Sequence, residues 1–431
     1  MTILLLFGIY CAVVVFYWFY SSPRKKQAGE FMKSSFKNGH FVELSAIDVS
    51  FLSVQGVHFM TFFETKTDTT VRPTEWVRER VRAVLKANSW LAGRLTDTYY
   101  DKKAHKSLFV PEMGDSDYHL ERCFNDLEVD DFAHTLIHPP RSAFADLGQS
   151  CINKDEPLWK VTFITHKTSS RCALFVSMSH IMGDGNTFFR IMNMLSETGP
   201  GPQSLDPNRV HLDKNIQNFH FFSRPIPLNS PTKIMQSIIK IITKLPAILF
   251  RKAPPGSLKI LDTCWIDEEK VRSARSGTVV TSNDVITSHI LREHSPCLGL
   301  MAMDLRKRMP QLKANLAGNY ISMICLQPTD YATPEGIRKV LEKELVSLQI
   351  QGLLTQADET IDTVLVTNWA AFSRDMLLPG LNFMHQFGLV PSTTVKEDML
   401  NKFWSIFRHA VVLIRSRRDD SIAVAQFGRI N

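Results

Sequence analysis

The chain has 431 residues, of which 44% are hydrophobic and 22% are charged, and its formal net charge is +7. This length predicts at least one substantial core and two lobes, and the composition excludes a disordered or fibrous protein. The net charge is modest, and zinc-finger, basic-zipper and RNA-platform patterns are missing, so we expect no nucleic-acid partner. The seven cysteines include no Cys-x-x-Cys pair, so the sequence predicts neither a metal site nor a disulfide framework.

Residues 1–22 are predicted to be a transmembrane anchor, followed by a polar tether over 23–40. Residues 2–20 carry no charged side chain, and a helix needs about 20 apolar residues to span a bilayer. Arg24, Lys25 and Lys26 follow, and the positive-inside rule places this flank in the cytoplasm. A cleaved signal peptide is the alternative, but the stretch has no positive n-region and ends in bulky residues. We expect a single-pass membrane protein of the endoplasmic reticulum whose folded part faces the cytoplasm.

Residues 41–200 are predicted to form the first lobe. Apolar runs indicate strands, and apolar residues at helical spacing indicate helices. Pro73 is expected to open a helix, because proline is favoured at the first helical position. The predicted strands cover 57–63, 158–166 and 172–178, and the predicted helices cover 73–88 and 186–195.

Residues 201–256 are predicted to be a crossover, and residues 257–431 a second lobe. The crossover contains proline-rich connectors and, at 233–252, isoleucine pairs interleaved with lysines. That segment is either a basic amphipathic helix on the membrane surface or a helix packed on the protein. In the second lobe we expect a helix over 282–293, capped by Ser282 or Asn283. The other helices are expected at 267–273 and 333–348, and strands at 298–303, 320–326, 363–366 and 422–427. Strands and helices alternate in both halves, which predicts an α/β fold.

The segment His180-Ile181-Met182-Gly183-Asp184-Gly185 follows the predicted strand 172–178. Imidazole titrates near neutrality, so His180 can take a proton from a hydroxyl while that oxygen attacks an activated carbonyl. No Gly-x-Ser-x-Gly elbow or papain-like cysteine signature is present, so no covalent intermediate is expected. Gly183 and Gly185 are expected to let the backbone turn tightly, and Asp184 to hold the loop through an arginine or backbone amides. The alternative is a loop histidine beside an ordinary Asp-Gly turn.

Several segments, in this order along 41–392, resemble the CoA-dependent acyltransferase superfamily. Within it, the chain is most similar to wax ester synthase/diacylglycerol acyltransferase enzymes, with the plant-type BAHD acyltransferases as the next relative. The segments that carry this resemblance are 44–52, 90–95, 180–185, 282–285, 303–308, 318–320 and 367–369.

The resemblance implies two chloramphenicol acetyltransferase-like lobes with a central tunnel, acyl-CoA as co-substrate and no bound cofactor. It implies that His180 is the general base and that Asp184, beside Gly185, is structural and pairs with an arginine. Arg94 and Arg306 are both candidates for that arginine. The remaining candidate substrate contacts, by resemblance, are Thr367, Trp369, Ser282 and Asn283.

Two departures from the family patterns bear on the function. Ser179 stands where wax ester synthases have the first of two adjacent histidines, and the BAHD "DFGWG" motif is missing. The leading hypothesis is an acyl-CoA:alcohol O-acyltransferase acting on a lipophilic alcohol such as a fatty alcohol or a diacylglycerol. One alternative is a BAHD-like transferase for a specialised-metabolite hydroxyl or amine. Another is a catalytically inactive acyl-CoA-binding membrane protein.

Overall fold

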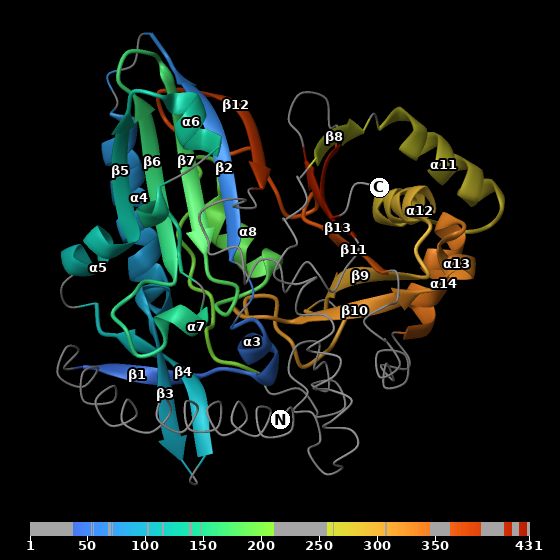
Figure 1. The fold of residues 1–431 in the computed structure, drawn as a ribbon, viewed down its shortest axis with the longest axis horizontal. Coiled ribbons are helices and arrows are strands. Elements are labelled where there is room, and N and C mark those ends of the chain that lie inside the picture. Colours follow the sequence, from blue (N-terminus) through green and yellow to red (C-terminus); the bar gives the residue numbers. More distant parts are fainter. Residues whose placement is uncertain are drawn as a thin grey trace, which may run out of the picture.

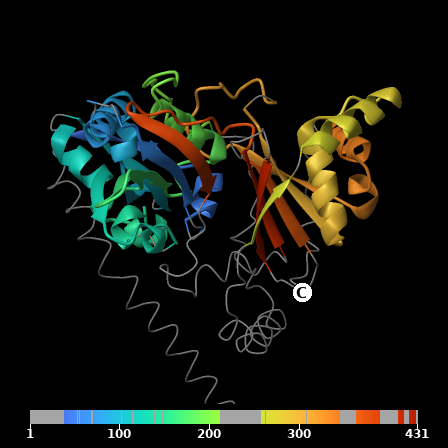
Figure 2. The same ribbon diagram turned by 90° about the horizontal axis from the view of Figure 1, so that it is seen from above.

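The computed structural model describes residues 38–210, 257–344, 363–388, 409–415 and 422–428, apart from single residues and pairs within these ranges. In this part of the chain two lobes lie side by side, each built on a β-sheet (Figures 1 and 2). The helices of the second lobe cover the face of its sheet that is turned away from the first lobe (Figure 2). The α/β fold class predicted from the sequence is therefore confirmed.

The first lobe is built on a five-stranded sheet with the order β12-β2-β7-β6-β5. Its neighbouring strands are antiparallel except for β5 and β6, which are parallel. Strand β7 is buried along its length after Arg171, because side chains cover both faces of the sheet there. The strands are β2 (Val57–Thr65), β5 (Phe124–Val129), β6 (Trp159–His166), β7 (Arg171–Met178) and β12 (Leu381–Gly388).

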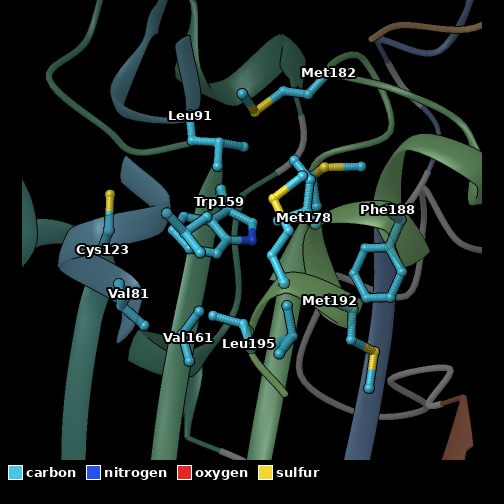
Figure 3. Close-up of a cluster of buried hydrophobic side chains, with 14 of the residues drawn as sticks. Val81, Leu91, Cys123, Trp159, Val161, Met178, Met182, Phe188, Met192 and Leu195 are labelled. Carbon is cyan, nitrogen blue, oxygen red and sulfur yellow. The ribbon is translucent and has the colours of Figure 1, made fainter. Parts of the chain in front are cut away.

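Two helices, α4 (Pro73–Ala87) and α8 (Gly185–Met194), contribute to the main core of this lobe. Pro73 stands at the start of α4 as expected, and the apolar residues of α4 that recur at helical spacing are buried. Trp159 lies at the centre of the cluster drawn in Figure 3. The other helices of the lobe are α5 (Ser116–Cys123), α6 (Phe132–Ile137) and α7 (Gly148–Cys151), with short 3-10 turns at Ser89–Ala92 and Arg141–Ala143.

A small three-stranded sheet with the order β1-β4-β3 adjoins the first lobe. It consists of β1 (Gly39–Glu43), β3 (Arg94–Tyr100) and β4 (Lys103–Pro111). The short helix α3 (Ala46–Ser50) follows β1 and begins with a capping box, in which Ser45 and Asp48 bind each other's backbone N–H groups. The sequence did not predict these strands, in which polar and apolar residues are mixed.

The second lobe has a six-stranded sheet with the order β10-β9-β11-β13-β14-β8. Its strands are β8 (Ser257–Leu261), β9 (Leu298–Asp304), β10 (Ile321–Leu326), β11 (Thr363–Asn368), β13 (His409–Arg415) and β14 (Ile422–Gly428). Its helices are α11 (Cys264–Arg275), α12 (Ser282–His294), α13 (Pro328–Tyr331) and α14 (Pro334–Glu344). A separate buried cluster joins this sheet to its helices.

Strand β12 comes from the second half of the chain but belongs to the first sheet. It pairs antiparallel with β2, from Leu381 opposite Thr65 to Gly388 opposite Phe59. This pairing satisfies the outer backbone edge of β2, and Phe383 packs into the first core. The expected boundary, with all of 257–431 in the second lobe, is therefore corrected, because β12 crosses back to the first lobe.

The predicted elements agree with the described structure at most positions. One correction concerns α12, which is capped by Thr281 and not by Ser282 or Asn283; the side chain of Thr281 and that of Asp284 form a capping box. The anchor at 1–22, most of the tether at 23–40 and the amphipathic segment at 233–252 lie outside the described residues. Among the helices that are described, none is long and apolar enough to cross a membrane.

Candidate active site

His180 lies directly beyond the end of β7, in a turn that is attached to the first core. The backbone N–H of Ser179 donates to the carbonyl of Leu158 at 2.7 Å, which continues the sheet by one residue. Ile181 and Met182 are buried in the core cluster of the first lobe, and this packing fixes the turn in place. The imidazole of His180 stacks on the ring of Phe51, with ring centroids 4.0 Å apart and planes 5° from parallel. The ring therefore has a defined plane and position.

Asn319, from the second lobe, determines which nitrogen of His180 carries the proton. The side-chain Nδ2 of Asn319 donates to the carbonyl of His180 at 2.8 Å and to Oδ1 of Asp48 at 2.8 Å. Both of its hydrogens face acceptors, so the amide is oriented with its oxygen toward the imidazole. That oxygen lies 3.1 Å from Nδ1 of His180 and can only accept. Nδ1 must therefore carry the hydrogen, and Nε2 keeps a free electron pair.

Burial lowers the pKa of His180 below its ordinary value, although a bond to its own backbone and the nearby Asp184 carboxylate act in the opposite direction. A lowered pKa keeps the imidazole neutral at physiological pH. Together with the free electron pair on Nε2, this gives His180 the protonation state that a general base requires.

Asp184 is the N-cap of α8 and is almost completely buried. Its Oδ1 accepts from the backbone N–H of Thr187 at 3.0 Å, and its Oδ2 accepts from that of Tyr320 at 2.9 Å. Burial alone would raise the pKa of Asp184. The charge and hydrogen bonds of Arg306, with the backbone hydrogen bonds from Thr187 and Tyr320, outweigh burial and hold the pKa below its usual value. Asp184 is thus an ionised carboxylate that joins α8 to the second lobe.

Arg306 is the arginine that pairs with Asp184. Its Nη1 and Nη2 donate to the two carboxylate oxygens at 2.8 and 3.2 Å. The same guanidinium donates to the carbonyls of Leu316 and Gly318 at 2.9 and 2.8 Å. The other candidate, Arg94, binds Asp155 through Nε at 2.6 Å instead. The choice that the sequence left open therefore falls on Arg306.

A second buried ion pair, which the sequence did not reveal, lies beside the first. Nε of Arg209 donates to Oδ2 of Asp48 at 2.9 Å, and both side chains are at most 1% exposed. Arg209 also donates to the carbonyl of Met182 in the His180 turn at 3.1 Å and to that of Ala317 at 2.7 Å. Asp48 lies in the family-like segment 44–52, but nothing in that segment indicated its partner, and Arg209 gave no local signal. These contacts tie the turn to both lobes.

The glycines of the segment are required by close approach and not by unusual backbone angles. A Cβ on Gly183 would lie 2.6 Å from the Cβ of Thr187, and one on Gly185 would lie 2.8 Å from the indole nitrogen of Trp369. Neither glycine is among those with positive φ. Gly318 is different: its φ is +130°, and a Cβ there would meet the guanidinium of Arg209. The expected tight turn is therefore better described as tight packing.

The structure brings two of the four candidate substrate contacts toward this loop. Trp369 packs against Gly185, and its ring meets Phe189 edge-on at 5.9 Å. Thr367 is opposite Val412 in the sheet, and Val412 packs into the first core, so Thr367 lies on the face toward the first lobe.

Asn283 lies in α12, on the face of the sheet turned away from the first lobe, and its Oδ1 accepts from Nδ2 of Asn368 at 2.8 Å. Ser282 is the first residue of α12 and is half-buried. Among the described residues, no group of histidine, cysteine and carboxylate side chains could hold a metal ion.

Part of the chain matches a known protein family. The family model of the wax ester synthase/diacylglycerol acyltransferase catalytic domain matches residues 44–249 of this chain. A comparison with curated protein sequences finds no match.

Several solved structures share the fold. TRI101 of F. sporotrichioides, in complex with coenzyme A and T-2, is 13% identical with a TM-score of 0.55, over 90% of this chain and 95% of that one. Polyketide synthase associated protein 5 from Mycobacterium tuberculosis is 15% identical with a TM-score of 0.51, over 90% and 92%. The condensation domain of the monacolin K polyketide synthase MokA is 10% identical with a TM-score of 0.53, again over 90% and 92%.

The fold and the family match together support an acyl-CoA acyltransferase as the class of enzyme. The chain resembles the CoA-dependent acyltransferase superfamily with its chloramphenicol acetyltransferase-like fold, as the sequence indicated. Within that superfamily, the sequence match is to wax ester synthase/diacylglycerol acyltransferase enzymes.

Proposed function

We propose that the protein transfers an acyl group from acyl-CoA to the hydroxyl of a lipophilic alcohol, with His180 as the general base. The observation that carries this proposal is the hydrogen bond between Nδ1 of His180 and Oδ1 of Asn319, which leaves Nε2 unprotonated. The lowered pKa of His180, caused by its burial, supports the same role. Coenzyme A is bound in the solved structure of TRI101, and acyl-CoA is the proposed co-substrate here.

The proposed reaction has two proton transfers. Nε2 of His180 accepts the hydroxyl proton while that oxygen attacks the thioester carbonyl carbon. The tetrahedral intermediate then collapses with cleavage of the carbon–sulfur bond, and the CoA sulfur leaves with the proton from His180. An ester and free CoA result, and no group of the protein is acylated. Asp184, held by Arg306, keeps the loop in place and takes no proton.

The lipophilic acceptor is proposed from the sequence and from the family match. Residues 1–22 are the proposed membrane anchor, and residues 233–252 are the proposed second membrane contact. The proposed location is the endoplasmic reticulum, with the active site in the cytoplasm. A membrane concentrates alcohols such as fatty alcohols and diacylglycerols near an anchored enzyme. The matched domain family is named for wax ester synthase and diacylglycerol acyltransferase activities, so fatty alcohols and diacylglycerols are the first acceptors to test.

The decisive experiment compares His180→Ala with a matched control. Purified full-length protein is incubated with a long-chain acyl-CoA and either a fatty alcohol or a diacylglycerol, and both ester and released CoA thiol are measured. We expect His180→Ala to lower kcat by about 10²- to 10⁴-fold, the usual contribution of a general base. His166→Ala is the control, because His166 ends β6 at the opposite end of the β6–β7 hairpin from His180. Undiminished turnover by His180→Ala would end the general-base assignment.

The pH dependence provides an independent test of the same role. A general base works only when deprotonated, so kcat/KM should be level at neutral pH and fall about tenfold per unit below the pKa of His180. Since burial lowers that pKa, the fall should begin below the ordinary histidine value of about 6.5. A midpoint above that value would contradict the assigned state of the ring.

A screen of acceptors distinguishes the alternatives. TRI101 is crystallised with T-2 mycotoxin, and a preference for a specialised-metabolite acceptor over lipid alcohols would favour a BAHD-like activity. Binding of acyl-CoA without release of CoA to any acceptor would favour an inactive binding protein.

A further inference from the structure

Asp48 is a fully buried carboxylate whose two oxygens face different partners. Oδ2 accepts from the backbone N–H of Ser45 at 2.9 Å, from its hydroxyl at 2.7 Å and from Nε of Arg209 at 2.9 Å. Oδ1 accepts from the backbone N–H of Asn319 at 3.0 Å and from its side-chain Nδ2 at 2.8 Å. One oxygen is therefore used by helix α3 and the arginine, and the other by Asn319.

The Asp48 carboxylate, together with the carbonyl of His180, gives the Asn319 amide its orientation. If the amide were reversed, its oxygen would face Oδ1 of Asp48 and the carbonyl of His180, both of which only accept. In the observed orientation the amide oxygen faces Nδ1 of His180 instead. A line of three groups thus runs from the Asp48 carboxylate through the Asn319 amide to the His180 ring.

We propose that Asp48 is a positioning residue of the active site, which acts through Asn319 to hold the hydrogen of His180 on Nδ1. This inference rests on the proposed role of Nε2 as the base. Asp48 does not contact substrate; it selects the tautomer whose free electron pair is on the reactive nitrogen. The hydrogen bond on one ring nitrogen decides the state of the other, so loss of the Asp48 charge is transmitted to Nε2.

The consequence of Asp48→Asn follows from the donors around it. Three donors, two from Ser45 and one from Arg209, would draw the new amide oxygen to the Oδ2 position. The new Nδ2 would then face the two N–H donors of Asn319. This favours reversal of the Asn319 side chain, and only the carbonyl of His180 still favours the observed orientation. A reversed Asn319 presents N–H to Nδ1 of His180, so Nδ1 becomes an acceptor and the hydrogen moves to Nε2.

The second lobe offers a closely matched control in Asp284. It is also a fully buried capping-box aspartate, bound to its N-cap residue Thr281 and to an arginine, Arg338. It differs in its Oδ1, which has no hydrogen-bond partner among the described residues, whereas Oδ1 of Asp48 holds Asn319. Asp284→Asn therefore reproduces the loss of a buried charge and a capping box without touching the His180 ring.

The test measures the ¹⁵N chemical shifts of the histidine ring nitrogens in full-length protein. These shifts report which nitrogen of His180 carries the hydrogen. The chain has 14 histidines, and His180→Gln assigns the His180 signals by their disappearance. We expect the wild type and Asp284→Asn to show the hydrogen on Nδ1. Asp48→Asn and Asn319→Ala should shift His180 toward the state with the hydrogen on Nε2, and lower kcat by about 10- to 100-fold with KM changed less than about twofold.

The outcomes separate the inference from the proposed function. An unchanged Nδ1–H state in Asp48→Asn would overturn the inference, since the ring's bond to its own backbone would then suffice. Full activity of His180→Gln with the expected tautomer shift would overturn the base role alone. If Asp48→Asn does not fold because Arg209 is left without its charge partner, Asp48→Asn with Arg209→Gln removes both charges and must give the same shift.

Discussion

Asp184 and Asp155 are both bound by a buried arginine, but they join different parts of the molecule. Asp184 is 1% exposed and takes hydrogen bonds from α8 and from two groups of the second lobe, Arg306 and the Tyr320 backbone. Asp155 is 23% exposed and is bound by Arg94 and by the hydroxyl of Tyr118, all within the first lobe.

The difference shows why a buried arginine in a family-like segment does not identify the functional pair. Both arginines are nearly or fully buried. Only Arg306 also holds the carbonyls of Leu316 and Gly318, next to Asn319 and the His180 turn. The position of the carboxylate between the lobes, and not the burial of the arginine, distinguishes the pair that shapes the site.

The largest expected effect is that of Asp184→Asn. The new amide nitrogen would face the donors Arg306, Thr187 and Tyr320, and the buried guanidinium would lose its counter-charge. We expect the free energy of unfolding to fall by about 3–5 kcal/mol, measured by chemical denaturation of the purified protein. Ester formation should also fall sharply at temperatures where the variant is still folded. A loss of stability no larger than that of Asp155→Asn would contradict the distinction between the two pairs.

Gly318→Ala tests the segment that connects the two buried ion pairs beside His180. Its φ of +130° is unfavourable for alanine, and the added Cβ would lie 2.8 Å from Nε of Arg209. We expect a loss of about 1–3 kcal/mol from backbone strain, with a further loss because Arg209 must move away from Asp48.

Gly201→Ala is the control for Gly318→Ala. Its φ is also positive, at +73°, but a Cβ there meets no atom within 4 Å. Equal losses of stability in the two variants would mean that the contact with Arg209 contributes nothing.

The parts of the fold and site that could be predicted from the sequence are those with a local pattern. Strands β6 and β7 and helix α8 show apolar periodicity. The His180 segment lies between β7 and α8, so His180 and its turn were predicted with the correct neighbours. Strand β12 was missed, because its pairing with β2 depends on a residue separation of several hundred positions.

The same distinction explains the residues around His180 that were missed. Asn319 and Asp48 lie in segments that resemble the family, yet their roles depend on a contact between residues 271 positions apart. Arg209 lies in a connector without periodicity and gives no local signal. The partner of Asp184 could be narrowed to two arginines by resemblance, but the choice required the arrangement of the two lobes.

The smallest expected effect is that of Asp155→Asn, the same chemical change at the more exposed pair. The amide oxygen can still accept from Nε of Arg94, and the lost charge lies partly in solvent, where screening weakens it. Arg94 also keeps its bond to the carbonyl of Ala92 at 2.7 Å. We expect a loss of about 1 kcal/mol or less and unchanged kcat, measured beside Asp184→Asn in the same denaturation and ester assays. A fall in kcat without a fall in stability would mean that the Arg94 pair also shapes the site, since it could then act on the His180 turn only through the first-lobe core.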